Sequence, residues 1–380
     1  MKTVLITGAR APIALDLFRS FTAAGWSAHL ADSIRPWTAR LAGLGPGRLH
    51  QFSPPRFAFE AFTADLGRLV SVLDVDLIVP TCEEVFYLAA AAERLGLVDR
   101  LFAPSPATLR RLHSKVEFAG LAQSFGIAAP QTWRVTSPEE LQPHLAQSAD
   151  LVFKPEFSRF ATKTLVRPTA EAAARLTPTA AAPWAVQAFV DGEELCLWSA
   201  IRNGEVVAFA AYRPLWRLGR SSSFYFETDR DPALLDFVRK IAGGIGGSGQ
   251  LSFDVIRGSD GAITPIECNP RGVSGLHLIG GGPGLAQAIT GEGPPVFADA
   301  DARHLSPAMW LLGAPKAVAT GRWREFRRDL ARSRDVLGSP MIGLGALLDA
   351  GRFCAVGLSR GRSASGQSTD DIEWNGEPIG

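Results

Sequence analysis

The chain has 380 residues, of which 46% are hydrophobic and 20% are charged. This length is enough for two or three packed domains, and the composition excludes wholesale disorder. Thirty-nine basic against 38 acidic residues give a formal net charge of +1. Proteins that bind nucleic acid by neutralising phosphates normally carry a basic excess, so the charge disfavours that class.

The first hundred residues alternate between strand and helix patterns. Residues 4–7 and 27–31 are short apolar runs typical of strands, and a helical spacing of apolar residues lies between them at 14–21. Residues 77–80 form a third such run, and a helical pattern follows from about 83 to 95. This alternation predicts a parallel sheet covered by helices.

The turn at residues 8–12 (GARAP) resembles the first turn of a dinucleotide-binding fold. It lacks the complete G-x-G-x-x-G pattern, because Arg and Ile stand at positions 10 and 13, so a tight strand–helix turn is the main interpretation. Glu83 follows the third strand, where ligands of open α/β sheets collect, and is a candidate for contacting an amine substrate. A carboxylate stabilised by a helix N-terminus is the competing interpretation.

The middle of the chain has a different organisation. A predicted helix at 109–125 is followed by an extended segment, a strand that ends near 154, and another strand at 184–190. Asn203-Gly204 predicts a tight hairpin within 201–212. A helix at 232–242 leads to a second hairpin with strands at 249–256 and 263–268, so an antiparallel α+β region is expected. Residues after 295 are rich in arginine and mostly helical in pattern.

The cysteines and the lengths of the apolar runs indicate the compartment in which the protein resides. The four cysteines lie far apart and form no C-x-x-C pair, which argues against a structural zinc site or a disulfide scaffold and is typical of a reducing compartment. The most apolar run, residues 341–348, is shorter than the roughly 18–20 residues that span a bilayer. The N-terminus has the pattern of a strand and not of a signal peptide. We therefore expect a cytoplasmic protein without a membrane partner.

Polar residues of the second hairpin form the sharpest chemical pattern. Glu267 and Asn269 are two residues apart on one strand, so they point to the same face, and Asp254 on the partner strand can oppose them. Two carboxylates and an amide oxygen suit Mg²⁺, which takes further ligands from water and substrate phosphates. A solvated polar sheet face is the alternative for these three residues taken alone.

Lysines are scarce in this chain, so the position of each one is informative. Only six of the 39 basic residues are lysines. Lys154 ends a strand and precedes a polar segment that contains Arg159 and Lys163, and Lys115 lies on the preceding helix. An ammonium group is a compact donor for phosphate oxygens, so two lysines ahead of an acidic metal face indicate a nucleotide site.

With these motifs, the chain resembles the ATP-grasp superfamily over about residues 1–285, in particular its carboxylate–amine ligases and carbamoyl-phosphate-synthase-like relatives. The resemblance implies α/β and α+β classes, with a Rossmann-like parallel-sheet domain ahead of a two-lobed ATP-grasp fold and a mostly helical C-terminal extension. The implied boundaries are 1–105 for the pre-ATP-grasp domain, 106–290 for the ATP-grasp domain (lid lobe about 130–188, metal-binding lobe about 189–290) and 291–380 for the extension.

The resemblance also implies the nucleotide site. Lys115 matches the first nucleotide-contacting lysine, Lys154 matches the second, and Glu194 matches the acid that binds ribose. The adenine hinge corresponds to Gln187, Ala188, Phe189 and Val190.

The metal and substrate residues follow from the same resemblance. Asp254, Glu267 and Asn269 match the metal-binding trio, with Asp254 in place of a frequent Glu, and the expected metal is Mg²⁺ or Mn²⁺. Arg271 matches the arginine that steadies the carboxylate substrate and its acyl phosphate. Three arginines, Arg213, Arg217 and Arg220, follow the first hairpin, and Arg213 is the preferred catalytic and substrate-contacting cation.

The sequence departs from the family at the loop over the phosphates. This loop is usually rich in glycine, yet residues 156–163 contain none. The side chains of Arg159 and Lys163 are expected to replace some of the backbone contacts. The alternative is a module that binds a nucleotide without turning it over.

The resemblance implies an ATP-dependent enzyme that activates a small carboxylate as an acyl phosphate and joins it to an amine. A homodimer is an assembly that the resemblance allows. One alternative is chemistry of the bicarbonate or carbamoyl-phosphate type. Another, based on the N-terminal turn, is a nicotinamide-dependent dehydrogenase.

Overall fold

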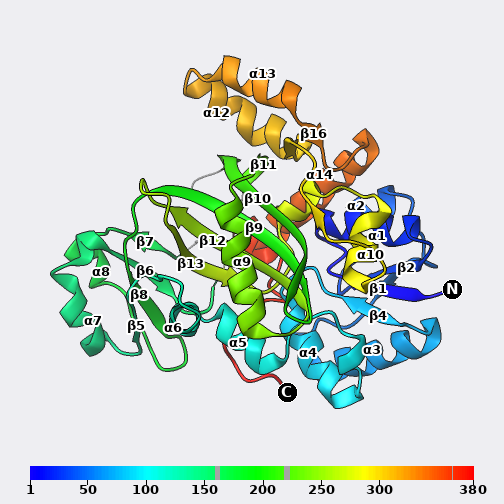
Figure 1. The fold of residues 1–380 in the computed structure, drawn as a ribbon, viewed down its shortest axis with the longest axis horizontal. Helices are drawn as coiled ribbons and strands as arrows, with labels where there is room; N and C mark the ends of the chain where they lie inside the picture. The colour runs from blue at the N-terminus through cyan, green and yellow to red at the C-terminus, as the bar shows by residue number, and fades with distance from the viewer. Residues whose placement is uncertain (159–162, 218–222, 362) are drawn as a thin grey trace.

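The computed structural model describes residues 1–158, 163–217, 223–361 and 363–380, and it contains three sheets (Figure 1). The predicted nucleotide contact Arg159 lies outside this part of the chain. The parallel N-terminal sheet and the antiparallel sheets after it confirm the expected fold class.

The N-terminal sheet has the strand order β3-β2-β1-β4 and is parallel throughout. Every residue of its central strand β1 is buried, because helices cover both faces, as expected for a parallel sheet. The strands are β1 (Thr3–Thr7), β2 (Ser27–Asp32), β3 (Leu49–Gln51) and β4 (Leu77–Val79). The helices are α1 (Pro12–Ala23), α2 (Trp37–Leu41), α3 (Phe59–Leu73) and α4 (Glu84–Leu95).

A smaller antiparallel sheet, the lid sheet, has the order β5-β8-β6-β7. Its strands are β5 (Thr132–Val135), β6 (Leu151–Pro155), β7 (Leu165–Val166) and β8 (Trp184–Ala188). Helices α7 (Pro138–Leu145) and α8 (Ala170–Ala173) accompany it. The lid sheet has its own hydrophobic core, which includes Leu141, Phe153 and Val186.

The large sheet has the order β13-β12-β9-β10-β11-β15-β16, with β14 paired to β10. Its strands are β9 (Glu193–Arg202), β10 (Glu205–Arg217), β11 (Ser223–Asp229), β12 (Gly249–Arg257), β13 (Ile263–Asn269), β14 (Val296–Phe297), β15 (Ala302–His304) and β16 (Arg334–Asp335). Both predicted hairpins are present. Asn203 and Gly204 have φ of 51° and 81°, the left-handed pair that a type I′ turn requires. Helix α9 (Pro232–Ile245) packs on this sheet.

The single helix expected at 109–125 is two helices, α5 (Pro106–His113) and α6 (Lys115–Ser124). Ser114 between them is extended (φ −64°, ψ 117°), and its side chain accepts a hydrogen bond from the amide of Glu117. An N-cap serine of this kind begins a new helix. Lys115 is therefore the first residue of α6, and its backbone amide donates to the carbonyl of Glu156 at 3.3 Å.

The C-terminal region is mostly helical, as expected, and three short strands (β14, β15 and β16) join it to the large sheet. Its helices are α10 (Pro283–Thr290), α11 (Ser306–Ala308), a π-helical turn at Met309–Gly313, α12 (Ala314–Ala319), α13 (Trp323–Arg332), α14 (Pro340–Ser359) and α15 (Ala364–Gln367). The last residues return to the N-terminal sheet, where Asp371 pairs with Arg10.

Helix α14 corrects the expected length of the most apolar run. Residues 341–348 were expected to be too short to span a bilayer, yet they belong to a helix that continues to Ser359 and is long and apolar enough to cross a membrane. In the folded chain the Asp349 carboxylate accepts hydrogen bonds from the backbone amides of Trp37 and Thr38, so its charge is used within the protein. Helices in the cores of soluble proteins can be equally long and apolar, but only 28% of the apolar stretch of α14 is buried.

A histidine pair between β2 and β3 links protonation to stability. His29 Nδ1 lies 3.0 Å from His50 Nε2, and burial lowers the pKa of His29 to about 4, with the charge of His50 as the second cause. The folded state therefore favours neutral His29. This contribution is complete above the unfolded pKa of 6.5 and is lost as the pH falls towards 4.

We expect His29→Gln to reduce the acid sensitivity of the fold. Urea unfolding of the wild type should show a lower free energy of unfolding at pH 5 than at pH 7, and the difference should be smaller in the variant. An equal difference in the two proteins would contradict the assignment.

Candidate active site

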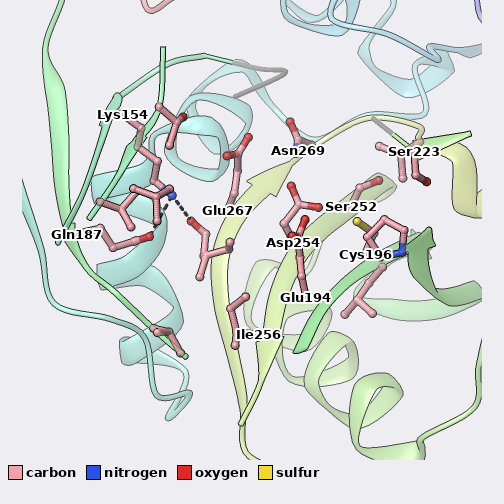
Figure 2. Close-up of a pocket in the computed structure, with 18 of the residues that line it drawn as sticks. Lys154, Gln187, Glu194, Cys196, Ser223, Ser252, Asp254, Ile256, Glu267 and Asn269 are labelled. Carbon is pink, nitrogen blue, oxygen red and sulfur yellow. Dashed lines mark hydrogen bonds between the residues drawn. The ribbon is translucent and has the colours of Figure 1, made fainter. Parts of the chain in front are cut away.

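A pocket with a volume of about 340 Å³ lies between the lid sheet and the large sheet (Figure 2). Strands β6 and β8 form one wall, and β9, β10, β12 and β13 form the other. The site residues predicted from the sequence that line it are Lys154, Gln187, Ala188, Phe189, Val190, Glu194, Asp254, Glu267, Asn269 and Arg271.

The acidic wall of the pocket comes from the β12–β13 hairpin. Asp254 is directly opposite Glu267, and Ser252 is opposite Asn269, so residues two apart on each strand share one face. Figure 2 shows Asp254, Glu267 and Asn269 directed into the same space. The register shifts just after Asp254, where the strand pairing is irregular.

The electrostatics of this wall favour a cation. Burial raises the pKa of Asp254 to about 7, and the neighbouring charge of Glu267 is the second cause. Two carboxylates this close repel each other, and a bound divalent cation would relieve that repulsion. No group of three or more His, Cys, Asp or Glu side chains is placed to hold a metal within the described ranges. The donor set here is therefore two carboxylates and the amide oxygen of Asn269, which are hard oxygen ligands suited to Mg²⁺.

Lys154 faces the acidic wall from the end of β6. Its ammonium group donates to Gln187 Oε1 at 3.0 Å and to the carbonyl of Ile266 at 2.9 Å, as the dashed lines in Figure 2 show. Burial lowers the pKa of Lys154 to about 8, while the charge of Glu267 acts in the opposite direction. An ammonium group has three N–H donors, and these two bonds use two of them.

Lys115 is buried behind the pocket and does not line it. Its Nζ lies 3.7 Å from Glu267 Oε1 and donates to the carbonyl of Ser158 at 3.0 Å. Lys115 therefore connects the acidic wall to Ser158, which lies in the predicted phosphate loop (156–163). Lys163, on the far side of that loop, is exposed and does not line the pocket either.

The structure does not bring Arg213 into the pocket. Tyr212 and Pro214 on either side of it line the cavity, so the alternation along β10 turns Arg213 to the opposite face. There Arg213 Nε donates to Glu193 at 2.6 Å, and Nη2 pairs with Asp229 at 2.7 Å. The sequence-based preference for Arg213 as a substrate-contacting cation is thus not supported by its position.

Arg217, the second arginine after the hairpin, does line the pocket. Strict alternation would place it on the face of Arg213, four residues earlier, but Trp216 between them has a left-handed φ of 47° and breaks the alternation. Arg217 makes two parallel hydrogen bonds of 2.7 Å with Glu194, the predicted ribose-binding acid.

We expect these two arginines to differ in function. Arg217→Ala should raise the apparent KM for ATP by roughly tenfold, because it removes a bidentate partner of Glu194 worth about 1–2 kcal/mol. Arg213→Ala should leave that KM within about twofold, because its partners lie on the opposite face. Steady-state ADP release over a range of ATP concentrations measures both, and the reverse order would restore Arg213 as the functional residue.

Arg271 joins the pocket to the N-terminal domain. Its Nη2 donates to Asn269 Oδ1 at 3.3 Å, and its Nε lies 3.6 Å from Glu83 Oε1. Glu83 is almost completely buried just ahead of α4 and does not itself line the pocket. Its carboxylate is therefore placed to orient Arg271, while direct contact with an amine substrate stays a prediction.

Cys196 and Tyr212 also line the pocket and were not among the predicted residues. They pair across β9 and β10, and Cys196 is also opposite Asp254. Burial holds the pKa of the Cys196 thiol well above its ordinary value, so the thiol stays protonated. Cys196 could have been predicted from the sequence, because it lies two residues after Glu194 on the same strand and therefore faces the same side.

The edge of the N-terminal sheet where a dinucleotide would bind is occupied by the protein itself. The backbone amide of Arg10 donates to Asp32 at 2.8 Å, and its guanidinium group pairs with Asp32 and with Asp371 of the C-terminal segment. At Gly8, which has a φ of 73°, an added Cβ would lie 2.3 Å from Thr81 Oγ1, so the turn is closely packed. This arrangement gives no support to the dehydrogenase interpretation.

No protein-family model matches the sequence, and no curated protein sequence matches it. Solved structures do match. The N5-carboxyaminoimidazole synthetase from Staphylococcus aureus is 13% identical over 83% of this chain and 85% of that chain, with a TM-score of 0.62. The L-amino acid ligase from Bacillus licheniformis is 16% identical over 77% and 76%, with a TM-score of 0.53. The phosphoribosylamine–glycine ligase from Thermotoga maritima is 14% identical over 78% and 77%, with a TM-score of 0.56. These likenesses show that the chain has the ATP-grasp fold.

Proposed function

We propose that this chain, which has the ATP-grasp fold, is an ATP-dependent ligase that activates a small carboxylate as an acyl phosphate and joins it to an amine. The observation that carries the proposal is the pairing, within one pocket, of the Asp254–Glu267–Asn269 face with the buried ammonium group of Lys154. A nucleoside triphosphate with bound metal needs carboxylates that hold the metal and a cation that contacts the phosphates, and the two walls of this pocket provide both.

The nucleotide is assigned to the lid side of the pocket. The hinge from Gln187 to Val190 would hold the adenine edge, and Glu194 would accept from the ribose. Lys154 would donate to a phosphate oxygen with its remaining N–H. Lys115 would act indirectly, by holding the carbonyl of Ser158 at the start of the phosphate loop.

Asp254, Glu267 and Asn269 are the residues that would hold Mg²⁺, or Mn²⁺ in its place. When bound, the metal would neutralise charge on the phosphate oxygens and keep them in position for transfer. Burial and the neighbouring charge of Glu267 both raise the pKa of Asp254, and a cation held between the two carboxylates would offset both effects.

In the proposed reaction an oxygen of the substrate carboxylate attacks the γ-phosphorus of ATP. The bond from this phosphorus to the oxygen that bridges it to the β-phosphate breaks, and ADP leaves. The amine then attacks the acyl carbon, inorganic phosphate leaves, and the nitrogen loses a proton. Arg271 would neutralise the carboxylate and its acyl phosphate, and Glu83 would keep the guanidinium group oriented.

Bicarbonate in place of an organic acid is the second candidate. The N5-carboxyaminoimidazole synthetase has a higher TM-score to this chain than the L-amino acid ligase has, 0.62 against 0.53. Bicarbonate would pass through the same first step, so the two candidates differ only in the acid that the pocket accepts.

An ADP-release screen distinguishes these candidates. The protein would be incubated with Mg²⁺ and ATP and with amino acids, other carboxylates or bicarbonate, each with and without an amine, and hydroxylamine would trap any acyl phosphate as a hydroxamate. The proposal expects release that depends on an organic acid. Release with bicarbonate alone would favour the second candidate, and ATP binding without any release would favour a non-catalytic nucleotide-binding module.

A further inference from the structure

The segment from residue 306 to residue 334, here named the C-terminal projection, exposes five large apolar side chains. It contains α11, the π-helical turn, α12 and α13, and Figure 1 shows α12 and α13 standing out at the top of the molecule. Its exposed large apolar side chains, with their exposed fractions, are Trp310 (53%), Leu311 (61%), Leu312 (41%), Val318 (68%) and Trp323 (40%). Three consecutive exposed apolar residues are not expected on a surface that faces only water.

The two tryptophans of the projection lie around one buried ring. The centroid of Trp310 is 5.6 Å from that of Phe326, and the centroid of Trp323 is 5.2 Å from it. Phe326 itself is fully buried, whereas both indoles remain about half-exposed. The indoles therefore form a rigid apolar patch anchored in the protein. Indole side chains, with an apolar body and one N–H group, are enriched where proteins meet the bilayer interface.

Basic residues are frequent in the same segment of the chain. Residues 314–334 carry seven basic residues and two acidic residues, a net charge of +5, whereas the whole chain has a net charge of only +1. The exposed arginines are Arg322, Arg324, Arg327, Arg328, Arg332 and Arg334. Arg322 pairs with Glu325 and Arg328 pairs with Asp329, so positive charge remains in excess.

We propose that the C-terminal projection docks on the surface of an anionic phospholipid bilayer. The combination of exposed tryptophan and leucine with an arginine excess matches what an interfacial membrane-binding segment needs. A second copy of this chain would bring two sets of arginines together. A nucleic acid would match the arginines but would leave the Trp310–Leu312 run exposed to water.

The projection is connected to the pocket. Lys316 Nζ donates to the carbonyl of Arg217 at 2.8 Å, and Trp216 and Phe224 pack in the same hydrophobic cluster as Phe326. Arg217 lines the pocket, so a bilayer docked on the projection would lie near the C-terminal end of β10. The proposal rests on the surface of the projection alone and does not depend on the proposed ligase activity.

Vesicle sedimentation tests this inference. The full chain would be mixed with vesicles of phosphatidylcholine, alone or with about 30% phosphatidylglycerol, at low and high salt. We expect binding to the anionic vesicles that weakens at high salt. The triple variant Trp310→Ser/Leu311→Ser/Leu312→Ser should bind at least about tenfold more weakly. The variant Arg324→Gln/Arg327→Gln/Arg332→Gln should lose about fivefold in affinity for each arginine removed.

A matched control carries the same kinds of change elsewhere. Val72→Ser/Val98→Ser removes two exposed apolar residues, and Arg68→Gln/Arg239→Gln removes two exposed arginines, all outside the projection. These variants should bind like the wild type, and circular dichroism would establish that every variant is folded. Equal loss in projection and control variants, or no binding to anionic vesicles, would overturn the proposal. The proposal would also be overturned if the protein formed a dimer or bound RNA through the projection, shown by loss of that binding in the projection variants, and did not bind vesicles.

Discussion

Glu267→Gln is expected to abolish measurable ADP release while leaving the fold intact. The substitution keeps the shape of the side chain and removes one of the two carboxylates that face each other across β12 and β13. Loss of one charged group that stabilises a transferring phosphoryl group costs roughly 10²–10³-fold in rate, and a metal ligand is lost as well. Lys154→Ala should have an effect of similar size, because it removes the buried cation opposite the acidic wall.

Control variants separate a loss of activity at the pocket from a loss of folding. Glu205→Gln and Lys240→Ala make the same chemical changes at exposed positions outside the pocket, and both should retain activity. Lys154→Met keeps the aliphatic stem that packs in the wall and removes only the ammonium group, so it should be as inactive as Lys154→Ala. Coupled assays of ADP release and thermal unfolding of each variant supply the two readouts. Full activity in both Glu267→Gln and Lys154→Ala would refute the assignment of the pocket.

The second large effect concerns stability. Arg10→Ala should lower the free energy of unfolding by about 3–5 kcal/mol, because it leaves buried carboxylates without their cation. The side chains of Arg10 and Asp32 are only 5% and 1% exposed, and the guanidinium group also holds Asp371 at 2.7 Å. The charge of Arg10 lowers the pKa of Asp371. The stabilising contribution of Asp371 is therefore present above its unfolded pKa near 3.8 and is lost as the pH falls through the lower folded value.

Arg68→Ala is the control for this prediction. Arg68 pairs with Asp65 at 3.0 Å, but its side chain is 59% exposed, so its loss should cost no more than about 1 kcal/mol. Urea unfolding at neutral pH compares the two variants, and limited proteolysis reports whether the C-terminal segment is released in Arg10→Ala. A small and similar decrease in the free energy of unfolding for Arg10→Ala and Arg68→Ala would show that the buried Arg10 network contributes little to stability.

The two hairpins were predictable because their signals are local. Asn203-Gly204 supplies the left-handed backbone that the first turn needs, and a period of two along β13 places Glu267 and Asn269 on one face. The alternation of strands and helices before residue 100 likewise predicted the parallel sheet. Each of these inferences depends on residues a few positions apart, and the conformations of such residues are strongly coupled.

Other parts of the site depend on single backbone departures that were not predicted from the sequence. The left-handed φ of Trp216 exchanges Arg217 for Arg213 at the pocket, and the N-cap at Ser114 places Lys115 behind Glu267 instead of beside the nucleotide space. Ser114 with Glu117 three residues later has the pattern of a helix N-terminus, which the prediction of a single helix missed, whereas a tryptophan rarely adopts a positive φ and gives no such signal. Tertiary packing selects these conformations.

The six lysines among 39 basic residues and the acidic hairpin were readable from the sequence alone, and they indicated where a nucleotide would bind, whereas the near-zero net charge only disfavoured nucleic-acid binding. The tertiary structure decided which cations face the pocket, that Asp371 pairs with Arg10 across 361 residues, and that Trp310 and Trp323 stay exposed in the arginine-rich segment. Contacts between residues so distant in the chain form because burial and charge pairing in the folded state favour them. Such contacts produce no local sequence pattern from which they could be predicted.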